Sequence, residues 1–420
     1  MTPSNSALPV VAGLGTALPE HCMTQDAAVE MAQQICCRSE TEQALARVLY
    51  RRSGVQRRHT AVPHETAYQY LNRVDAGTAA GNAEEPAAAS RAAHRGDGTN
   101  HAANGAALAA GERATQGAAK GPTTGERLDL YREFAPPLAL RAAAQALAAA
   151  GREAASITHL VTVSCTGFLA PGIDVTLIEG LGMRPTVERL NVGFMGCHGA
   201  LNGLAAADAI VRARPQSRVL VCAVELCSLH YCFEWDPARA VGNAVFADGA
   251  AALVLEAPTE IVHPSNGHAA ASQIGAGTAR GWRLAATGSC LIPHSTDAMS
   301  WRIGDHGFEM YLSATVPGVI GEHLRPWLAA WLAEQGLAIE EVGSWAVHPG
   351  GPRILTAVEE ALGLPRSATA VSREILAAMG NMSSPTVLFI VERLAAAGSP
   401  RPCVALGFGP GLTAQAALFL

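Results

Sequence analysis

Three side chains that could take part in one reaction lie far apart in the sequence: Cys197, His348 and Asn381. Cys197 follows a glycine in the segment GFMGCHGA, and the apolar periodicity of the residues after it predicts a helix that begins there. The unpaired N–H groups and the dipole at a helix start favour a thiolate, which is the nucleophilic form of cysteine. A free cysteine is most often a small buried apolar residue, so the glycine-flanked helix start is the feature that marks Cys197 as a nucleophile.

His348 stands at the end of a predicted strand in the segment SWAVHPGGPRIL. Pro349, Gly350 and Gly351 follow it and force the chain to turn, which exposes the imidazole at the tip of the strand. His198 lies beside Cys197, but successive helical residues point about 100° apart, so we expect His198 to pack or to line the rim of a site. His348 is therefore the better partner for the thiolate.

Asn381 precedes a predicted apolar helix in the segment GNMSSPTVLFI. An asparagine in this place is most often an N-cap, because its side-chain oxygen accepts from a free helix N–H. Its amide could instead donate to an oxyanion without supplying a proton. The residues around Asn381 leave both interpretations open.

Strands and helices alternate in the part of the chain that must position these side chains. Apolar runs predict strands at 157–164, 218–226, 250–256, 342–347 and 403–408. Helical periodicity with Pro and Gly at the ends predicts helices near 137–151, 352–362 and 384–397. This alternation is typical of an α/β protein.

The two parts of the chain repeat one pattern of strand, Pro-Gly loop, helix and Leu-Gly stop. Cys197 follows the end of the first such strand by 32 residues, and Asn381 follows His348 by 33. The repeat predicts two duplicated halves, 1–262 with the cysteine and 263–420 with the histidine and asparagine. If the halves pack about a pseudo-twofold axis, the three side chains converge at the centre.

One segment, 76–125, differs in composition from the rest. It contains 18 Ala and 9 Gly, and Leu108 is its one large apolar residue. Such a stretch buries too little surface to offset the entropy of ordering it, which predicts a disordered insertion.

The overall composition bears on partners and location. The formal charge is −6, from 30 basic and 36 acidic residues without a dense basic block, so we do not expect nucleic acid as a partner. The N-terminus lacks the features of a secretion signal, and no stretch approaches the ~20 apolar residues of a membrane span, which favours a cytoplasmic protein. The ten cysteines lack paired zinc-site spacing, so we expect free thiols and no metal site.

Four segments in order, GFMGCHGA, WAVHPGGPRIL, GNMSSPTVLFI and GFGPGLT, resemble the signatures of type III polyketide synthases, the chalcone synthase-like family of the thiolase superfamily. The resemblance covers the chain apart from its extreme N-terminus and the 76–125 insertion. It implies a layered αβαβα fold, a homodimer, and coenzyme A thioesters as substrates without a tightly bound cofactor. By the same resemblance, Cys197 accepts an acyl group from an acyl-CoA starter, and His348 and Asn381 complete the family's triad. Malonyl-CoA then loses carbon dioxide and extends the chain, which cyclises to a pyrone, a resorcinol or a related polyketide.

The resemblance also implies a set of residues that line the substrate pocket. Phe246 matches the family's gatekeeping phenylalanine, and Gly242 lies four residues before it. Met310 replaces a second gatekeeping phenylalanine of the plant enzymes, and Cys227 and His230 replace threonines. The segment WRIGDHGFEMYLSATVPG is closer to bacterial members. These departures leave the starter, the number of extensions and the cyclisation open.

Arg57 and Arg58, in YRRSGVQRRH, stand near the equivalent of the family's basic coenzyme-binding segment. A guanidinium suits phosphate oxygens well, so we expect these two residues to contact coenzyme A. A solvated basic patch is the alternative interpretation.

Three other functions are compatible with part of this pattern. A β-ketoacyl carrier-protein synthase III-like enzyme also uses Cys, His and Asn, but the His-Pro-Gly-Gly setting and the GFGPGLT ending disfavour it. A non-catalytic thiolase-like binding subunit would not need Cys197, His348 and Asn381 together. A cysteine hydrolase is disfavoured because nothing in the sequence favours hydrolysis in a water-excluding tunnel.

Overall fold

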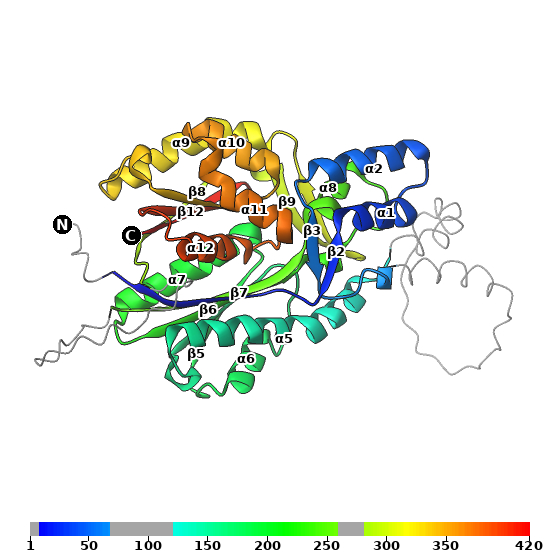
Figure 1. The fold of residues 1–420 in the computed structure, drawn as a ribbon. Helices are drawn as coiled ribbons and strands as arrows, with labels where there is room; N and C mark the ends of the chain where they lie inside the picture. The colour runs from blue at the N-terminus through cyan, green and yellow to red at the C-terminus, as the bar shows by residue number, and fades with distance from the viewer. Residues whose placement is uncertain (1–7, 68–120, 259–280) are drawn as a thin grey trace, which may run out of the picture.

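Two β-sheets form the centre of the computed structural model, which describes residues 8–67, 121–258 and 281–420 (Figure 1). The first sheet has the order β1-β7-β6-β4-β5, with β1 Val10–Ala17, β4 His159–Ser164, β5 Glu188–Gly193, β6 Arg218–Leu226 and β7 Asp248–Glu256. The second has the order β11-β12-β13-β8, with β8 Leu284–Leu291, β11 Ser344–Val347, β12 Cys403–Gly409 and β13 Thr413–Phe419. Each sheet changes along its width from parallel to antiparallel pairing.

Helices form three further layers around and between the sheets. α7 Gly199–Ala213 and α12 Thr386–Ala396 lie between them, and their apolar residues share one core with both sheets. α5 Thr124–Ala150 and α6 Ile173–Leu181 cover the outer face of the first sheet. α9 Val316–Glu334 and α10 Pro352–Leu362 cover the outer face of the second. The order of layers confirms the predicted αβαβα fold.

Smaller elements surround the end of the sheets where the candidate residues lie. They are β2 His21–Thr24, β3 Arg57–Thr60, the hairpin strands β9 Met299–Gly304 and β10 Gly307–Leu312, and the helices α1 Gln25–Ile35, α2 Glu40–Arg52, α8 Pro237–Val245 and α11 Ala370–Met379. Two one-turn 3-10 helices, η3 Gly196–His198 and η4 Cys227–His230, follow β5 and β6. Four more, η2 Ala154–Ser156, η5 Thr296–Ala298, η6 Ile339–Glu341 and η7 Arg366–Thr369, connect other elements.

The helix predicted to begin near Pro137 begins at Thr124 instead. Thr123 and Glu126 form a reciprocal capping box at its start, and Pro136 and Pro137 lie inside the helix. The helix continues through the prolines because its long buried face, with Tyr131 and Leu138, packs on the first sheet, and this packing outweighs the lost N–H donors.

Two predictions fall wholly or largely outside the described residues. The boundary between the halves at 262/263 lies there, and so does the 76–125 insertion except for 121–125. Thr124 and Gly125 belong to α5, so the insertion ends earlier than predicted.

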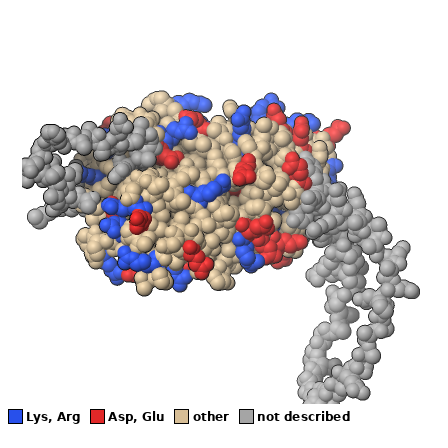
Figure 2. Space-filling model, turned by 60° about the horizontal axis from the view of Figure 1, so that its bottom comes forward, with Lys and Arg blue, Asp and Glu red and all other residues tan. Residues whose placement is uncertain are grey.

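The described surface and helices bear on the expected partners. On the face in Figure 2, acidic and basic side chains are interspersed among uncharged ones. Within the described ranges, no helix is long and apolar enough to cross a membrane. Nor do the described side chains include a group of three or more His, Cys, Asp or Glu that could hold a metal ion.

Candidate active site

Cys197 lies in the one-turn helix η3, which joins β5 to α7. The turn requires glycine at 196, because Gly196 has φ +69° and a Cβ there would lie 2.5 Å from Cδ of Pro410. The predicted helix start is therefore present in a modified form, since α7 itself begins two residues later at Gly199.

The surroundings of the Cys197 sulfur differ from the sequence expectation. Burial raises the pKa of the thiol to about 11, and hydrogen bonds from Ser383 and Asn381 lower it by less. The buried Glu225 carboxylate raises it further. Desolvation of the charge therefore opposes the thiolate preference that the helix start predicts.

Asn381 does not cap the helix that follows it. α12 begins at Thr386 with Pro385 at the capping position, whereas Asn381 Oδ1 accepts from the backbone N of Ser383 at 2.8 Å. With the oxygen engaged, the amide nitrogen is the part of Asn381 that is left to donate to the Cys197 sulfur. Backbone hydrogen bonds of 2.8 and 2.9 Å with Val245 and Ala247 hold Asn381 beside Phe246.

His348 directly follows β11 and donates its backbone N–H to Leu406 O at 2.8 Å. Its side chain is buried, and neither ring nitrogen has a hydrogen-bond partner among the described residues. Burial lowers the pKa of His348 to about 3, and the charge of nearby His198 acts in the same direction. His198 is itself buried, with Nδ1 2.5 Å from Asn202 Oδ1, which fits the packing role expected of it.

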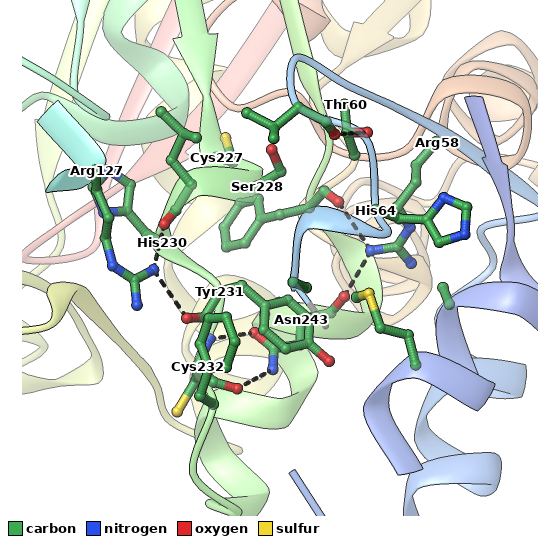
Figure 3. A pocket seen from close by; sticks show the side chains of 18 of the residues that line it. Arg58, Thr60, His64, Arg127, Cys227, Ser228, His230, Tyr231, Cys232 and Asn243 are labelled. Atoms are coloured by element: carbon green, nitrogen blue, oxygen red, sulfur yellow. Dashed lines mark hydrogen bonds between the residues drawn. The ribbon is translucent and has the colours of Figure 1, made fainter. Parts of the chain in front are cut away.

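Two cavities meet beside Cys197. A small cavity of about 360 Å³, including its open mouth, is lined by Cys197, Cys165, Ser383 and Pro410 among others. A larger pocket has a volume of about 1050 Å³, including its open mouth. Its lining includes Met31 of α1 and Tyr50 of α2, and Figure 3 shows Arg58, His64, Cys227 and His230 around it. Cys227, Phe246, Trp301 and Met310 line both cavities and form what we call the shared wall.

All five residues predicted to line the substrate pocket lie at the larger pocket. Three of them, Cys227, Phe246 and Met310, belong to the shared wall, while Gly242 and His230 line the larger pocket alone. The lack of a side chain at Gly242 keeps space open beside Met310. A Cβ built at this position would lie 3.3 Å from Cε of Met310, which is a tight contact.

Several residues of the site were not predicted. Glu225 is fully buried and accepts from Cys165 N at 2.9 Å, Thr166 N at 3.0 Å and Ser384 Oγ at 2.6 Å. It thereby joins the loop after β4 to the segment before α12. Its signal in the sequence was a charged residue inside the apolar run RVLVCAVEL. Trp301 and Ser383 carried no comparable signal.

Arg58 has a different role from the predicted coenzyme contact. Its guanidinium is buried and donates to the carbonyls of Asn243 at 2.6 Å, Ala244 at 2.6 Å and Phe246 at 3.0 Å (Figure 3). These are the last carbonyls of α8 and the residue after it, which a cation stabilises. Arg58 therefore holds the Phe246 backbone, whereas Arg57 is exposed and stays a prediction as a coenzyme contact.

Comparisons with known proteins give a consistent assignment. Residues 111–258 match the N-terminal domain of chalcone and stilbene synthases, and residues 283–420 match the C-terminal domain. The chain is 34% identical over 302 residues to the alpha-pyrone synthesis polyketide synthase-like protein Pks18 of Mycobacterium tuberculosis, covering 71% of this chain and 73% of that protein. It is 34% identical over 409 residues to the 1,3,6,8-tetrahydroxynaphthalene synthase of Streptomyces peucetius subsp. caesius, covering 96% of this chain and 91% of that enzyme. The crystal structure of PKS-I from the brown alga Ectocarpus siliculosus superposes with a TM-score of 0.79, at 29% identity and 99% coverage of both chains.

Proposed function

The chain belongs to the chalcone and stilbene synthase family and is a type III polyketide synthase, and from this premise we propose that it extends an apolar acyl starter held in the larger pocket. The observation that carries the proposal is the position of Cys197. The thiol lies in a small cavity that shares one wall with a much larger, mainly apolar pocket. An acyl group on the sulfur then has space for its chain across that wall.

In the loading step, the Cys197 sulfur attacks the carbonyl of the acyl-CoA starter and forms a new thioester. Because the pKa of the buried thiol is raised to about 11, its proton must leave as the carbon–sulfur bond forms. Neither ring nitrogen of His348 has a hydrogen-bond partner among the described residues, so its unprotonated nitrogen can accept that proton and pass it to the departing coenzyme A sulfur.

In the extension step, malonyl-CoA loses carbon dioxide and the resulting enolate attacks the Cys197 thioester. The Asn381 amide and an imidazole N–H of His348 are donors that can stabilise the enolate oxygen in a site with little water. Phe246, Trp301 and Met310 present apolar surfaces, which favour conversion of a carboxylate to neutral carbon dioxide. As the new carbon–carbon bond forms, the thioester bond to Cys197 breaks and the sulfur leaves as a thiolate that takes up a proton. The lengthened chain stays on coenzyme A, from which it is reloaded onto Cys197 or cyclised.

We propose an α-pyrone with an apolar tail as the product. The large pocket supports this choice, as does the similarity to a mycobacterial protein described as an alpha-pyrone synthesis polyketide synthase-like protein. The test is purified enzyme with malonyl-CoA and acyl-CoA starters of two to sixteen carbons, without carrier protein, read by product mass. Tailed pyrones are expected. A naphthalene formed from malonyl-CoA alone contradicts the starter proposal, and no product at all contradicts the assigned chemistry.

The roles of the triad need their own test. C197A is expected to abolish both acyl-enzyme formation and product, whereas N381A is expected to keep acylation and lose decarboxylation. Mass spectrometry of the intact protein after incubation with starter alone reports the first step, and carbon dioxide release reports the second. Product formation by C197A contradicts the proposed nucleophile.

We also propose that two copies pair along the free edge of the first sheet. β5 is the edge strand there, and Leu190 on it is 45% exposed. Phe168, Phe194 and Met195 lie close by and are also exposed. A free strand edge with apolar side chains is unfavourable in water and favours association. Light scattering is expected to show twice the 43.4 kDa chain mass.

Two further proposals concern coenzyme A and location. Arg57 is exposed beside β2 and can contact a phosphate, so R57A is expected to raise KM for malonyl-CoA without changing kcat.

All ten cysteines are free in the structure, which supports a reducing compartment such as the cytoplasm. Fractionation of the native host tests this location.

A further inference from the structure

The β9–β10 hairpin carries half of the shared wall but is not part of either large sheet. Its two strands form a separate sheet in which Trp301 pairs with Met310 and Ile303 pairs with Phe308. Its ends are held by backbone contacts, such as Gly411 N to Met299 O at 2.9 Å. Since no other strand in the described part of the chain pairs with the hairpin, other contacts must hold Trp301 and Met310 in place.

His230 provides one such contact. Phe308 donates its backbone N–H to His230 Nδ1 at 3.0 Å, and His230 Nε2 lies 2.6 Å from Thr166 O. Because Nδ1 accepts, Nε2 must carry the hydrogen and donate to the carbonyl, which selects one neutral tautomer. The imidazole therefore links the loop after β4 directly to the middle of β10.

Ring packing reinforces this link. The imidazole stacks on the Phe308 ring at 4.1 Å with an interplanar angle of 10°, and it meets the Trp301 ring edge-on at 5.8 Å. Burial lowers the pKa of His230 to about 3, so the neutral tautomer is retained at neutral pH. Both ring nitrogens are used within the protein, which leaves His230 no donor or acceptor for a substrate.

A second contact reaches the neighbouring carbonyl of the same loop. Trp301 Nε1 donates to Cys165 O at 2.8 Å. The loop itself is held by the buried Glu225, which accepts from the backbone N–H groups of Cys165 and Thr166. The hairpin is thus attached at two adjacent carbonyls to a loop anchored in the first half of the chain.

We propose that His230 is a positioning residue: it holds the Trp301–Met310 wall at a fixed distance from Cys197 and so sets how long an acyl chain the site accepts. The part of this inference that concerns chain length rests on the proposed function, while the part that concerns the hairpin does not. His230 is expected to act through the wall, because it lines the larger pocket but not the small cavity of Cys197.

The test compares H230L with H230Q. Leucine removes both hydrogen bonds, so the amides of residues 299–312 are expected to exchange with deuterium about tenfold faster. The ratio of long to short products is expected to shift about threefold. Glutamine offers one acceptor and one donor, and H230Q is expected to restore exchange and product ratio toward the parent.

H323L is the matched control, because His323 lies half-exposed on α9 and pairs with its neighbour Glu322. It is expected to leave both readouts unchanged. Parent-like hairpin exchange and product ratio in folded H230L overturn the proposal. If H230L does not fold, W301F, which loses the bond to Cys165 O, replaces it: faster exchange supports the anchored hairpin, and unchanged exchange contradicts it. If the parent makes no polyketide, the proposed function fails, and hairpin exchange still decides the role of His230.

Discussion

A leucine at position 242 tests whether the larger pocket holds the starter chain. Gly242 lies on α8, and a Cβ built there would approach Met310 Cε at 3.3 Å and a ring carbon of Phe246 at 3.5 Å. The flexible methionine can move for an alanine. The three further carbons of a leucine must enter the pocket beside the shared wall, so we expect G242L to block the path of a long chain.

The size of the effect follows from the apolar lining. Each methylene removed from water contributes about 0.8 kcal/mol, which corresponds to about fourfold in kcat/KM. In the parent enzyme, lengthening the starter by two carbons is therefore expected to raise kcat/KM about 15-fold until the pocket is filled. In G242L this gain is expected to disappear beyond the shortest starters, while G242A keeps most of it.

The assay measures coenzyme A release with butyryl-, hexanoyl-, octanoyl- and decanoyl-CoA in the presence of malonyl-CoA, with products identified by mass. G321L is the control, because a Cβ at Gly321 on α9 meets no atom within 4 Å. Its dependence on starter length should equal that of the parent. The reasoning is refuted if the parent shows no dependence on starter length, or if G242L retains the parent's dependence.

Three further predictions concern the carboxylate, the oxyanion donor and the subunit contact. In E225Q, a buried carboxylate that accepts hydrogen bonds from several donors is replaced by an amide whose nitrogen cannot accept them. Urea denaturation should show a free energy of unfolding lower by about 3 kcal/mol, and a loss below about 1 kcal/mol contradicts the role of Glu225. N381A should reduce carbon dioxide release from malonyl-CoA about 100-fold, since one oxyanion donor is lost, and near-parent release contradicts this. L190E places a charge on the exposed edge strand and should shift the light-scattering mass to that of one chain, whereas an unchanged mass excludes this edge as the interface.

Much of the fold could be predicted from local patterns. The strand predicted at 218–226 is β6, and the helix predicted at 352–362 is α10, with the same bounds in each case. Both are marked by apolar runs between turn residues, which are local signals. The predicted start of α5 was wrong because Pro136 and Pro137 are a local stop signal that long-range packing overrides. The hairpin β9–β10 had no such signal, since only Gly307 and Phe308 of its strands are fully buried.

The sequence by itself determined which groups are available for chemistry: a cysteine at a helix start, a histidine at a strand end and an asparagine before an apolar helix. Four motifs in the sequence also indicated the family. Only the tertiary structure decided how those groups are charged and what their neighbours do. Burial raises the pKa of Cys197 and lowers that of His348, and burial depends on atoms from distant parts of the chain. Likewise, the side chains of Arg58 and His230 form hydrogen bonds with backbone groups more than 60 residues away in the sequence. No local sequence pattern can indicate such partners.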